Sequence, residues 1–300
     1  LSYLVPALKE AQDVEGLTTH FYRIAQWINE DTDSVLTFWM EVIDLDWIDE
    51  NSVAERLAIF LSDIQEENLP LIAPLLERLI NMPKPKHSLL GRVVAKAINS
   101  GALSDTALWH FISGDVSDED VIEFNIDNKL HCQPYDLGND KKLLKQQMVK
   151  STVLLNLALE TIEQWSQIQF RHYGATRIGY RMGLLNDSSY SDTHTQQDYR
   201  HIDSKRYLLD AVENAIIEHA QKNSHWWQEN RERLCFSHEG VLVYFAILSL
   251  ISQPVTNIDL VGRLLCDKNL LEFELSYELG TLIKTAFIHL DGSTQDSVIS

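Results

Sequence analysis

Four residues past the middle of the chain have the side-chain types of a metal or acid–base site, namely His194, Asp198, His201 and Asp203. Imidazole nitrogens and carboxylate oxygens are common ligands of zinc and other divalent metals. The histidine spacing would suit two helical turns, but serine and threonine crowd this segment and no glutamate stands nearby as a base. We therefore expect a solvated loop in which Asp203 or Ser204 caps the next helix. A free-standing metal-dependent enzyme is the alternative.

The cysteines give no support for catalysis. They are few and far apart, which excludes a disulfide framework and favours a reducing compartment. His131 and Cys132 are adjacent in the sequence, and adjacent residues rarely present a nucleophile and its base together. Cys235 and Cys266 lie in apolar helical contexts, so we expect both to be small core residues.

The short signatures of common enzymes are also missing from the sequence. It contains no GxxxxGK[ST] phosphate loop, no GxGxxG, no HExxH, no CxxC pair and no GxSxG elbow. The sequence therefore predicts no catalytic residue, no bound metal and no cofactor, and we expect that this chain is not an enzyme.

Arginine and tyrosine gather around a long polar loop that runs from Asn186 to Asp203. Both residue types are enriched at protein-binding hot spots, and long ordered loops are often functional. The alternative is that these arginines pair with the surplus of carboxylates elsewhere in the fold. Trp226 and Trp227 follow, and neighbouring positions on a helix point about 100° apart, so we expect that they are not both fully buried. The predicted protein-binding residues are Arg171, Arg177, Tyr180, Arg181, Tyr190, Tyr199, Arg200, His201, Arg206, Trp226 and Trp227.

The elements that position these residues are helices, because apolar residues recur at helical spacing along most of the chain. Residues 1–112 form an acidic helical array, in which Gly101 ends one helix and Ser104 begins the next. Residues 141–300 form a second array, with helices from Lys141 to about Tyr173 and from Gly240 to Ser252. Ser224 is the expected cap of a short helix between them.

Residues 113–140 break the helical pattern. The stretch is acidic, and Ile122, Phe124 and Ile126 alternate with polar residues. It is either a short strand pair or a docked loop, and we interpret it as an irregular junction between the two arrays. Successive amphipathic hairpins without a fixed repeat period predict an all-α fold, an irregular HEAT/TPR-like α-solenoid or stacked helical hairpins.

Charge and hydropathy limit the partners. The net charge is −19, and residues 1–140 carry 25 acidic against 9 basic residues. Such a field opposes binding to a nucleic-acid backbone. The best apolar run, from Val241 to Ile251, is too short to span a membrane, and no signal peptide is recognisable. We expect a cytoplasmic protein that binds neither nucleic acid nor membrane.

The second array resembles a known family over roughly residues 175–290. Its segments YRMGLLNDSSYSDTHTQQDYRHIDSKRYLLDAVENAIIEHA, WWQENRERLCFSHEGVLVYFAILSL and RLLCDKNLLEFELSYELGTLIKTAFIHL are similar to the C-terminal helical repeats of large bacterial STAND NTPases, the NACHT-like antiviral sensors called AVAST proteins. The resemblance rests on an amphipathic helix pair, a short link, an RLLCD-type turn and an SYELG-type helix start.

The resemblance implies that the chain is the sensor part of a longer protein, which agrees with a sequence that begins at Leu1. In this family the repeats bind a viral protein, and binding drives oligomerisation through an ATPase module that these residues do not contain. The implied partner is a protein ligand, such as a phage structural or packaging protein. An acidic assembly scaffold that docks a basic partner remains a further alternative.

Overall fold

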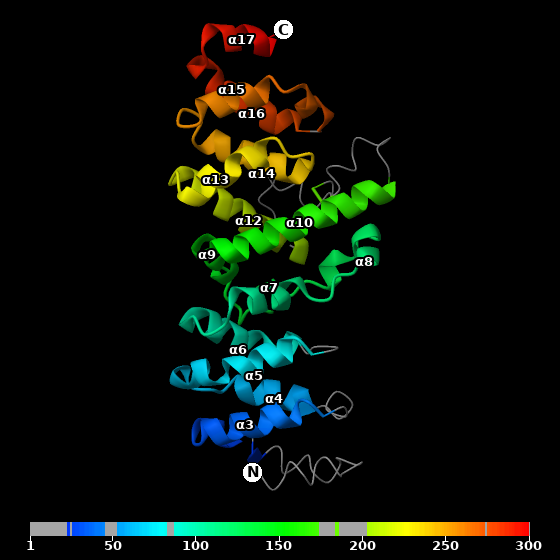
Figure 1. Ribbon diagram of the computed structural model, residues 1–300, viewed down its shortest axis with the longest axis vertical. Helices are drawn as coiled ribbons and strands as arrows, with labels where there is room; N and C mark the ends of the chain where they lie inside the picture. Colours follow the sequence, from blue (N-terminus) through cyan, green and yellow to red (C-terminus); the bar gives the residue numbers. More distant parts are fainter. Residues whose placement is uncertain are drawn as a thin grey trace. The chain divides into compact units, whose positions relative to one another are not determined.

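The structure of the chain, a computed structural model, describes residues 23–24, 26–45, 53–82, 87–173, 184–185, 203–273 and 275–299. These residues form fourteen α-helices joined by turns and short 3₁₀ segments, and no strand occurs among them (Figure 1). The predicted all-α helical-repeat fold is confirmed. Contacts divide the chain into two compact units, of which the first comprises Leu1–Gly114 and Leu130–Leu143 and the second Asp115–Lys129 and Leu144–Ser300.

The described residues of the first unit form five α-helices that pack as overlapping hairpins. They are α3 (Thr32–Val42), α4 (Val53–Leu61), α5 (Leu69–Ile80), α6 (His87–Ser100) and α7 (Asp105–Ser113). Helices pack on the next but one, α3 on α5, α4 on α6 and α5 on α7, and α6 also packs on its neighbours α5 and α7. Trp39, Leu76 and Phe111 are among the side chains buried between them. This alternation is the packing expected of stacked helical hairpins.

The second unit also consists of stacked helices, and it contains the two longest described helices, α10 and α12. Its elements are α8 (Asp118–Ile122), η3 (Ile126–Asn128), α9 (Leu143–Lys150, which starts at the unit boundary), α10 (Thr152–Tyr173), α12 (Ser204–Gln221), α13 (His225–Cys235), α14 (Gly240–Ser252), α15 (Ile258–Leu265), η6 (Lys268–Glu272), α16 (Ser276–Ala286), η7 (Phe287–His289) and α17 (Gly292–Ile299). α12 packs on α14 and α14 on α16, which follow one another in Figure 1. Nearly the whole surface of α14 is buried.

Local sequence signals set the helix ends as predicted. Gly101 follows α6 with φ 71°, a conformation that glycine adopts without strain, and the next amide donates to the Ala97 carbonyl at 2.9 Å. Ser104 caps α7 by accepting a hydrogen bond from the Ala107 amide. Ser224 caps α13 in the same way.

A loop of the first unit, Leu130–Leu143, depends on a second glycine. Its backbone lies so close to α6 that a Cβ on Gly91 would come within 2.0 Å of the Asp136 carbonyl oxygen. Only glycine allows this approach. The loop adds Leu130, Cys132 and Leu137 to the buried core.

The strand pair that the alternation at Ile122, Phe124 and Ile126 suggested is wrong. Residues 115–129 form the short helix α8 and the 3₁₀ turn η3, which is the docked-loop alternative. Across the ranges given above, no helix is long and apolar enough to cross a membrane.

Candidate protein-binding site

Seven of the predicted binding residues lie outside the residues that the structure describes: Arg177, Tyr180, Arg181, Tyr190, Tyr199, Arg200 and His201. The same holds for His194 and Asp198 of the possible metal cluster. The fourth member of that cluster, Asp203, is the N-cap of α12, where its Oδ1 accepts the Arg206 amide at 2.8 Å. The capping role predicted for this position is therefore confirmed. No group of three metal-binding side chains occurs within the described part of the chain.

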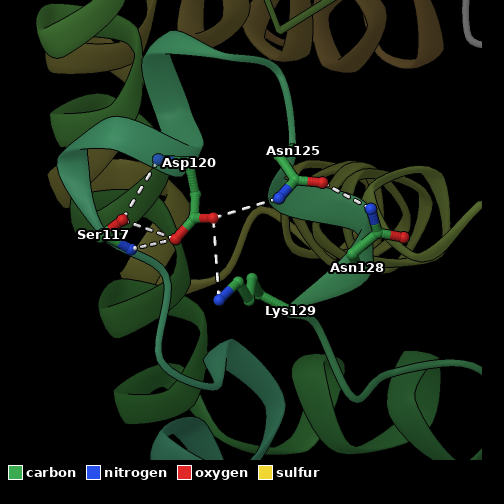
Figure 2. Close-up of polar contacts among 5 residues, drawn as sticks. All are labelled: Ser117, Asp120, Asn125, Asn128 and Lys129. Atoms are coloured by element: carbon green, nitrogen blue, oxygen red, sulfur yellow. Dashed lines mark hydrogen bonds and ion pairs between the residues drawn. The ribbon is translucent and has the colours of Figure 1, made fainter.

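The described ends of the Arg171–Arg206 segment are the end of α10 and the start of α12. Both contact the turn of residues 115–129, which we name the α8 hairpin. Its first half is fixed by Ser117 and Asp120, which form a reciprocal capping box (Figure 2). The Ser117 Oγ and amide both donate to Asp120 Oδ2, at 2.6 and 3.0 Å, and these hydrogen bonds hold the pKa of Asp120 below its usual value.

The second half of the hairpin is tied back to the same carboxylate. Asn125 Nδ2 donates to Asp120 Oδ1 at 3.2 Å, and Lys129 Nζ lies 3.8 Å from that oxygen (Figure 2). Asn128 Nδ2 in turn donates to Asn125 Oδ1. One carboxylate thus joins the start of α8 to the end of η3.

The reversal between α8 and η3 requires an unusual backbone conformation. Phe124 has φ 57°, a left-handed conformation that bulky side chains rarely adopt. Its ring stacks on Tyr173, with 5.9 Å between centroids, and about half of the Phe124 side chain stays exposed. This stacking offsets part of the cost of the strained backbone.

The hairpin docks on the end of α10 through the last carbonyls of α8. Gln169 Nε2 donates to the Val121 carbonyl at 3.1 Å, and the Tyr173 hydroxyl donates to the Ile122 carbonyl at 2.7 Å. Both carbonyls lie at a helix end, where intrahelical partners are absent. Two side chains of α10 therefore supply the C-terminal capping that α8 cannot supply itself.

The hairpin also contacts the start of α12. Asp127 Oδ1 accepts the Lys205 amide at 2.7 Å, within the first turn of that helix. The end of α10 and the start of α12, which flank the Arg/Tyr-rich segment, are thus bound to one hairpin. Leu184 and Leu185, inside the segment, are buried as well.

The predicted binding residues in the described part of the chain have different environments. Arg171 is exposed at the end of α10, and Arg206 is half-buried in the first turn of α12. The expectation about the tryptophans is wrong, because Trp226 and Trp227 are 5% and 0% exposed. Neither presents a binding surface in this structure.

Both tryptophans are buried because α13 has neighbours on two sides. Trp226 Nε1 donates to Asn156 Oδ1 of α10 at 2.7 Å. Trp227 Nε1 donates at 3.2 Å to Asn257 Oδ1, just before α15, and Arg231 donates to the same oxygen. Two side chains that point about 100° apart on one helix can therefore both be buried, when each of them packs against a different neighbouring segment.

His219 of α12 lies against the first of these tryptophans, with 5.1 Å between the ring centroids. Its Nδ1 is 2.9 Å from the Ser224 hydroxyl that caps α13. Burial, reinforced by the nearby Lys222 ammonium, lowers the pKa of His219 below its ordinary value. The His219 imidazole is thus a structural part of the contact between α12 and α13.

The cysteines divide into two kinds. Cys132 and Cys235 are buried, as expected for Cys235, and burial raises the pKa of the Cys235 thiol to about 12. The expectation that Cys266 is a core residue is wrong, since it is exposed just after the last turn of α15. The buried stripe of α15 ends at Leu264, and the chain turns away before Cys266 can join it.

Sequence reasoning missed a surface hollow of about 590 Å³, which Cys266 and His289 line between α15 and α17. Arg263 in this hollow donates two hydrogen bonds to Glu232, at 2.6 and 2.8 Å, and Asp291 caps α17 through Ser293 and Thr294. Its charged groups Arg263 and Asp291 therefore already have partners within the chain. No motif in the sequence marks this hollow.

No protein-family model, no curated protein and no solved structure matches this chain.

Proposed function

We propose that this chain is a protein-binding module of stacked helical hairpins, and that it is the sensor part of a longer bacterial STAND NTPase. Its ligand is a viral protein, recognised in the cytoplasm by the Arg171–Arg206 segment. Ligand binding then triggers oligomerisation through the ATPase module of the parent protein in antiviral defence. The similarity of residues 175–290 to AVAST repeats supports the choice of parent.

One observation supports the binding site above all others. The α8 hairpin contacts both the end of α10, through Tyr173, and the start of α12, through the Lys205 amide. A binding segment whose two ends are fixed loses less conformational entropy on association than a free loop does. Arginine and tyrosine on such a segment suit a protein ligand, because both are enriched at interface hot spots.

The test is binding to a panel of purified phage structural and packaging proteins, measured by biolayer interferometry. We expect one member of the panel to bind with a dissociation constant in the micromolar range or below. The triple variant Arg177→Glu, Arg181→Glu and Arg200→Glu should weaken that binding by about a hundredfold, because three interface charges are reversed. Circular dichroism should show an unchanged helix content.

A matched triple variant controls for the change in net charge. Arg92, Lys141 and Lys150 are exposed basic residues outside the segment, and their replacement by glutamate changes the charge equally. This control should bind like the wild type. The proposal fails if no panel member binds, or if both triple variants lose affinity to the same extent.

A further inference from the structure

The turn between α8 and η3 presents a small aromatic surface. The Phe124 ring stacks on the Tyr173 ring at an interplanar angle of 27°, and the His172 ring meets Tyr173 edge-on, with 4.7 Å between the centroids. Phe124 is 49% exposed, and His172 is exposed as well. Three rings from two elements therefore form one continuous surface, here named the aromatic platform.

The backbone of Phe124 is held in a conformation that does not suit this residue type. At φ 57° a bulky side chain is strained, whereas glycine or asparagine is tolerated. Packing inside the chain does not fully offset this strain, because about half of the Phe124 side chain stays in water. Strained residues of this kind gather at ligand contacts. We therefore expect a ligand to cover the exposed face of this ring.

The α8 hairpin also carries an excess of negative charge. Its residues 115–129 include six acidic residues and one basic residue, Lys129, which lies 3.8 Å from Asp120. Four other carboxylates are exposed and form no ion pair with any described residue, namely Asp115, Asp118, Glu119 and Glu123. The hairpin therefore has negative charge that the described part of the chain does not neutralise.

Two of these carboxylates adjoin the aromatic platform. Glu119 and Glu123 are one helical turn apart, since the Glu123 amide donates to the Glu119 carbonyl at 2.8 Å. Glu123 directly precedes Phe124 in the chain. Two like charges at this helical spacing repel each other, and a cation beside them removes the repulsion.

An aromatic face beside free carboxylates suits a cation. The face of an aromatic ring attracts cations, and arginine occurs at such contacts more often than lysine. The guanidinium group is planar, so it stacks on a ring while its edge donates hydrogen bonds to carboxylates. The negative field of the hairpin opposes any anionic group at the same place. The chemistry of this surface therefore favours an arginine in a basic segment over an acidic or phosphorylated one.

We propose that the aromatic platform binds an arginine side chain in a basic segment of the protein ligand. The guanidinium group stacks on the exposed face of Phe124, and its N–H groups donate to the carboxylates of Glu119 and Glu123. Tyr173 supports the Phe124 ring from the other side. This inference deepens the proposed function and rests on it for the ligand being a protein, but the affinity of the platform for arginine is measurable with peptides alone.

A synthetic peptide with three arginines separated by glycines is the probe, and its lysine and citrulline versions are the comparison. Citrulline has the shape of arginine without the charge. In TROSY NMR titrations at about 0.05 M salt, the arginine peptide should shift the amide signals of residues 119–124 and 172–173. We expect a dissociation constant of about 1 mM or below. The lysine peptide should bind about threefold more weakly, and the citrulline peptide at least about tenfold more weakly.

Phe124→Gly removes the ring without changing the charge. Glycine adopts φ 57° without strain, so the amide signals of the α8 hairpin should stay dispersed, while the affinity for the arginine peptide should fall at least about tenfold. Tyr135→Ala is the matched control, because it removes an aromatic ring of the first unit that is 65% exposed. This control should bind the peptide like the wild type.

Removal of the charge pair is a second test that leaves the turn itself unchanged. Glu119→Gln together with Glu123→Gln should weaken binding of the arginine peptide by about tenfold, and both side chains are exposed, so the fold should be retained. Glu66→Gln together with Glu67→Gln removes the same charge at exposed positions of the first unit. This control pair should have little effect on binding.

The proposal is overturned if the arginine and citrulline peptides bind alike, or if no shift appears at these residues up to about 10 mM peptide. It is also overturned if the Phe124 variant and the charge-pair variant bind like their controls. These outcomes are separate from those of the proposed function. A chain that binds the arginine peptide but no phage protein keeps the platform and loses the proposed function, whereas the opposite result removes the platform alone.

Discussion

Asp136 is a buried carboxylate whose environment favours the protonated form. Its side chain is 4% exposed and accepts the Gln133 amide through Oδ2 at 3.0 Å. Burial raises the pKa of Asp136 from 3.8 to about 6, although this hydrogen bond acts in the opposite direction. The folded chain therefore retains a proton between about pH 4 and pH 6 that the unfolded chain has released.

The sign of the resulting pH dependence follows from this difference in bound protons. Because the folded state binds the proton more tightly, the free energy of unfolding of the first unit falls as pH rises from about 4 to 6. At pH 7 the loss amounts to as much as about 3 kcal/mol. Asp136→Asn removes the titration, so the variant should be more stable than the wild type at pH 7.5 and similar to it at pH 4.

Urea denaturation followed by tryptophan fluorescence, at several pH values between 4 and 7.5, measures this effect. Trp39 and Trp109 are buried in the first unit and report its unfolding. Asp63→Asn is the control, because it makes the same chemical change at an exposed aspartate of the first unit. If the free energy of unfolding of Asp136→Asn fell between pH 4 and pH 6 as steeply as that of the wild type, the raised pKa would not belong to Asp136.

At the scale of elements, the α8 hairpin depends on one N-cap. Ser117→Ala removes the acceptor of the Asp120 amide and one of the two Ser117 donors to the Asp120 carboxylate, while the backbone amide remains as the other donor. We expect a loss of about 1 kcal/mol in local stability. Hydrogen exchange of the α8 amides should accelerate about fivefold, as measured by mass spectrometry of peptides that cover residues 115–129.

Ser297→Ala serves as the comparison for this prediction. Ser297 lies on α17, and its hydroxyl donates to the Ser293 carbonyl within the same helix without capping it. Exchange in the α8 hairpin should not change in this variant. Equal exchange rates in wild type and Ser117→Ala would show that the capping box does not stabilise the hairpin.

The elements also differ in how far the sequence predicts them. Gly101, Ser104 and Ser224 were predictable, because each acts on residues within one helical turn. The α8 hairpin was not, since its reversal at Phe124 and its capping by Gln169 and Tyr173 depend on contacts between distant residues. An alternating pattern without knowledge of those partners fits a strand equally well.

The same distinction applies to the site. The helical periodicity predicted the scaffold, and the residue types predicted a binding segment. Neither pattern shows that the α8 hairpin contacts both ends of that segment. The burial of Trp226 and Trp227 likewise depends on Asn156 and Asn257, which are far away in the sequence. Pairing of this kind follows from tertiary packing alone.

At the scale of the whole molecule, the two units each have a buried core of their own. We therefore expect two unfolding transitions in differential scanning calorimetry at pH 7.5. Asp136→Asn should shift only the transition of the first unit, and Ser117→Ala only that of the second. A single transition that both variants shift alike would contradict this expectation.

The order of the segments along the chain has a consequence for synthesis. The first unit needs residues 130–143, which follow the α8 hairpin, and the hairpin needs Gln169 and Lys205, which follow later still. On the ribosome the first unit can close over Gly91 only after Leu143 has emerged. The α8 hairpin must then wait while about thirty further residues are translated before its α10 partners emerge, and about sixty before Lys205 of α12 does, which takes at least several seconds at ordinary elongation rates. Nascent chains stalled when residue 143 has emerged from the ribosome and residue 169 has not should therefore contain a protease-resistant first unit and a protease-sensitive hairpin.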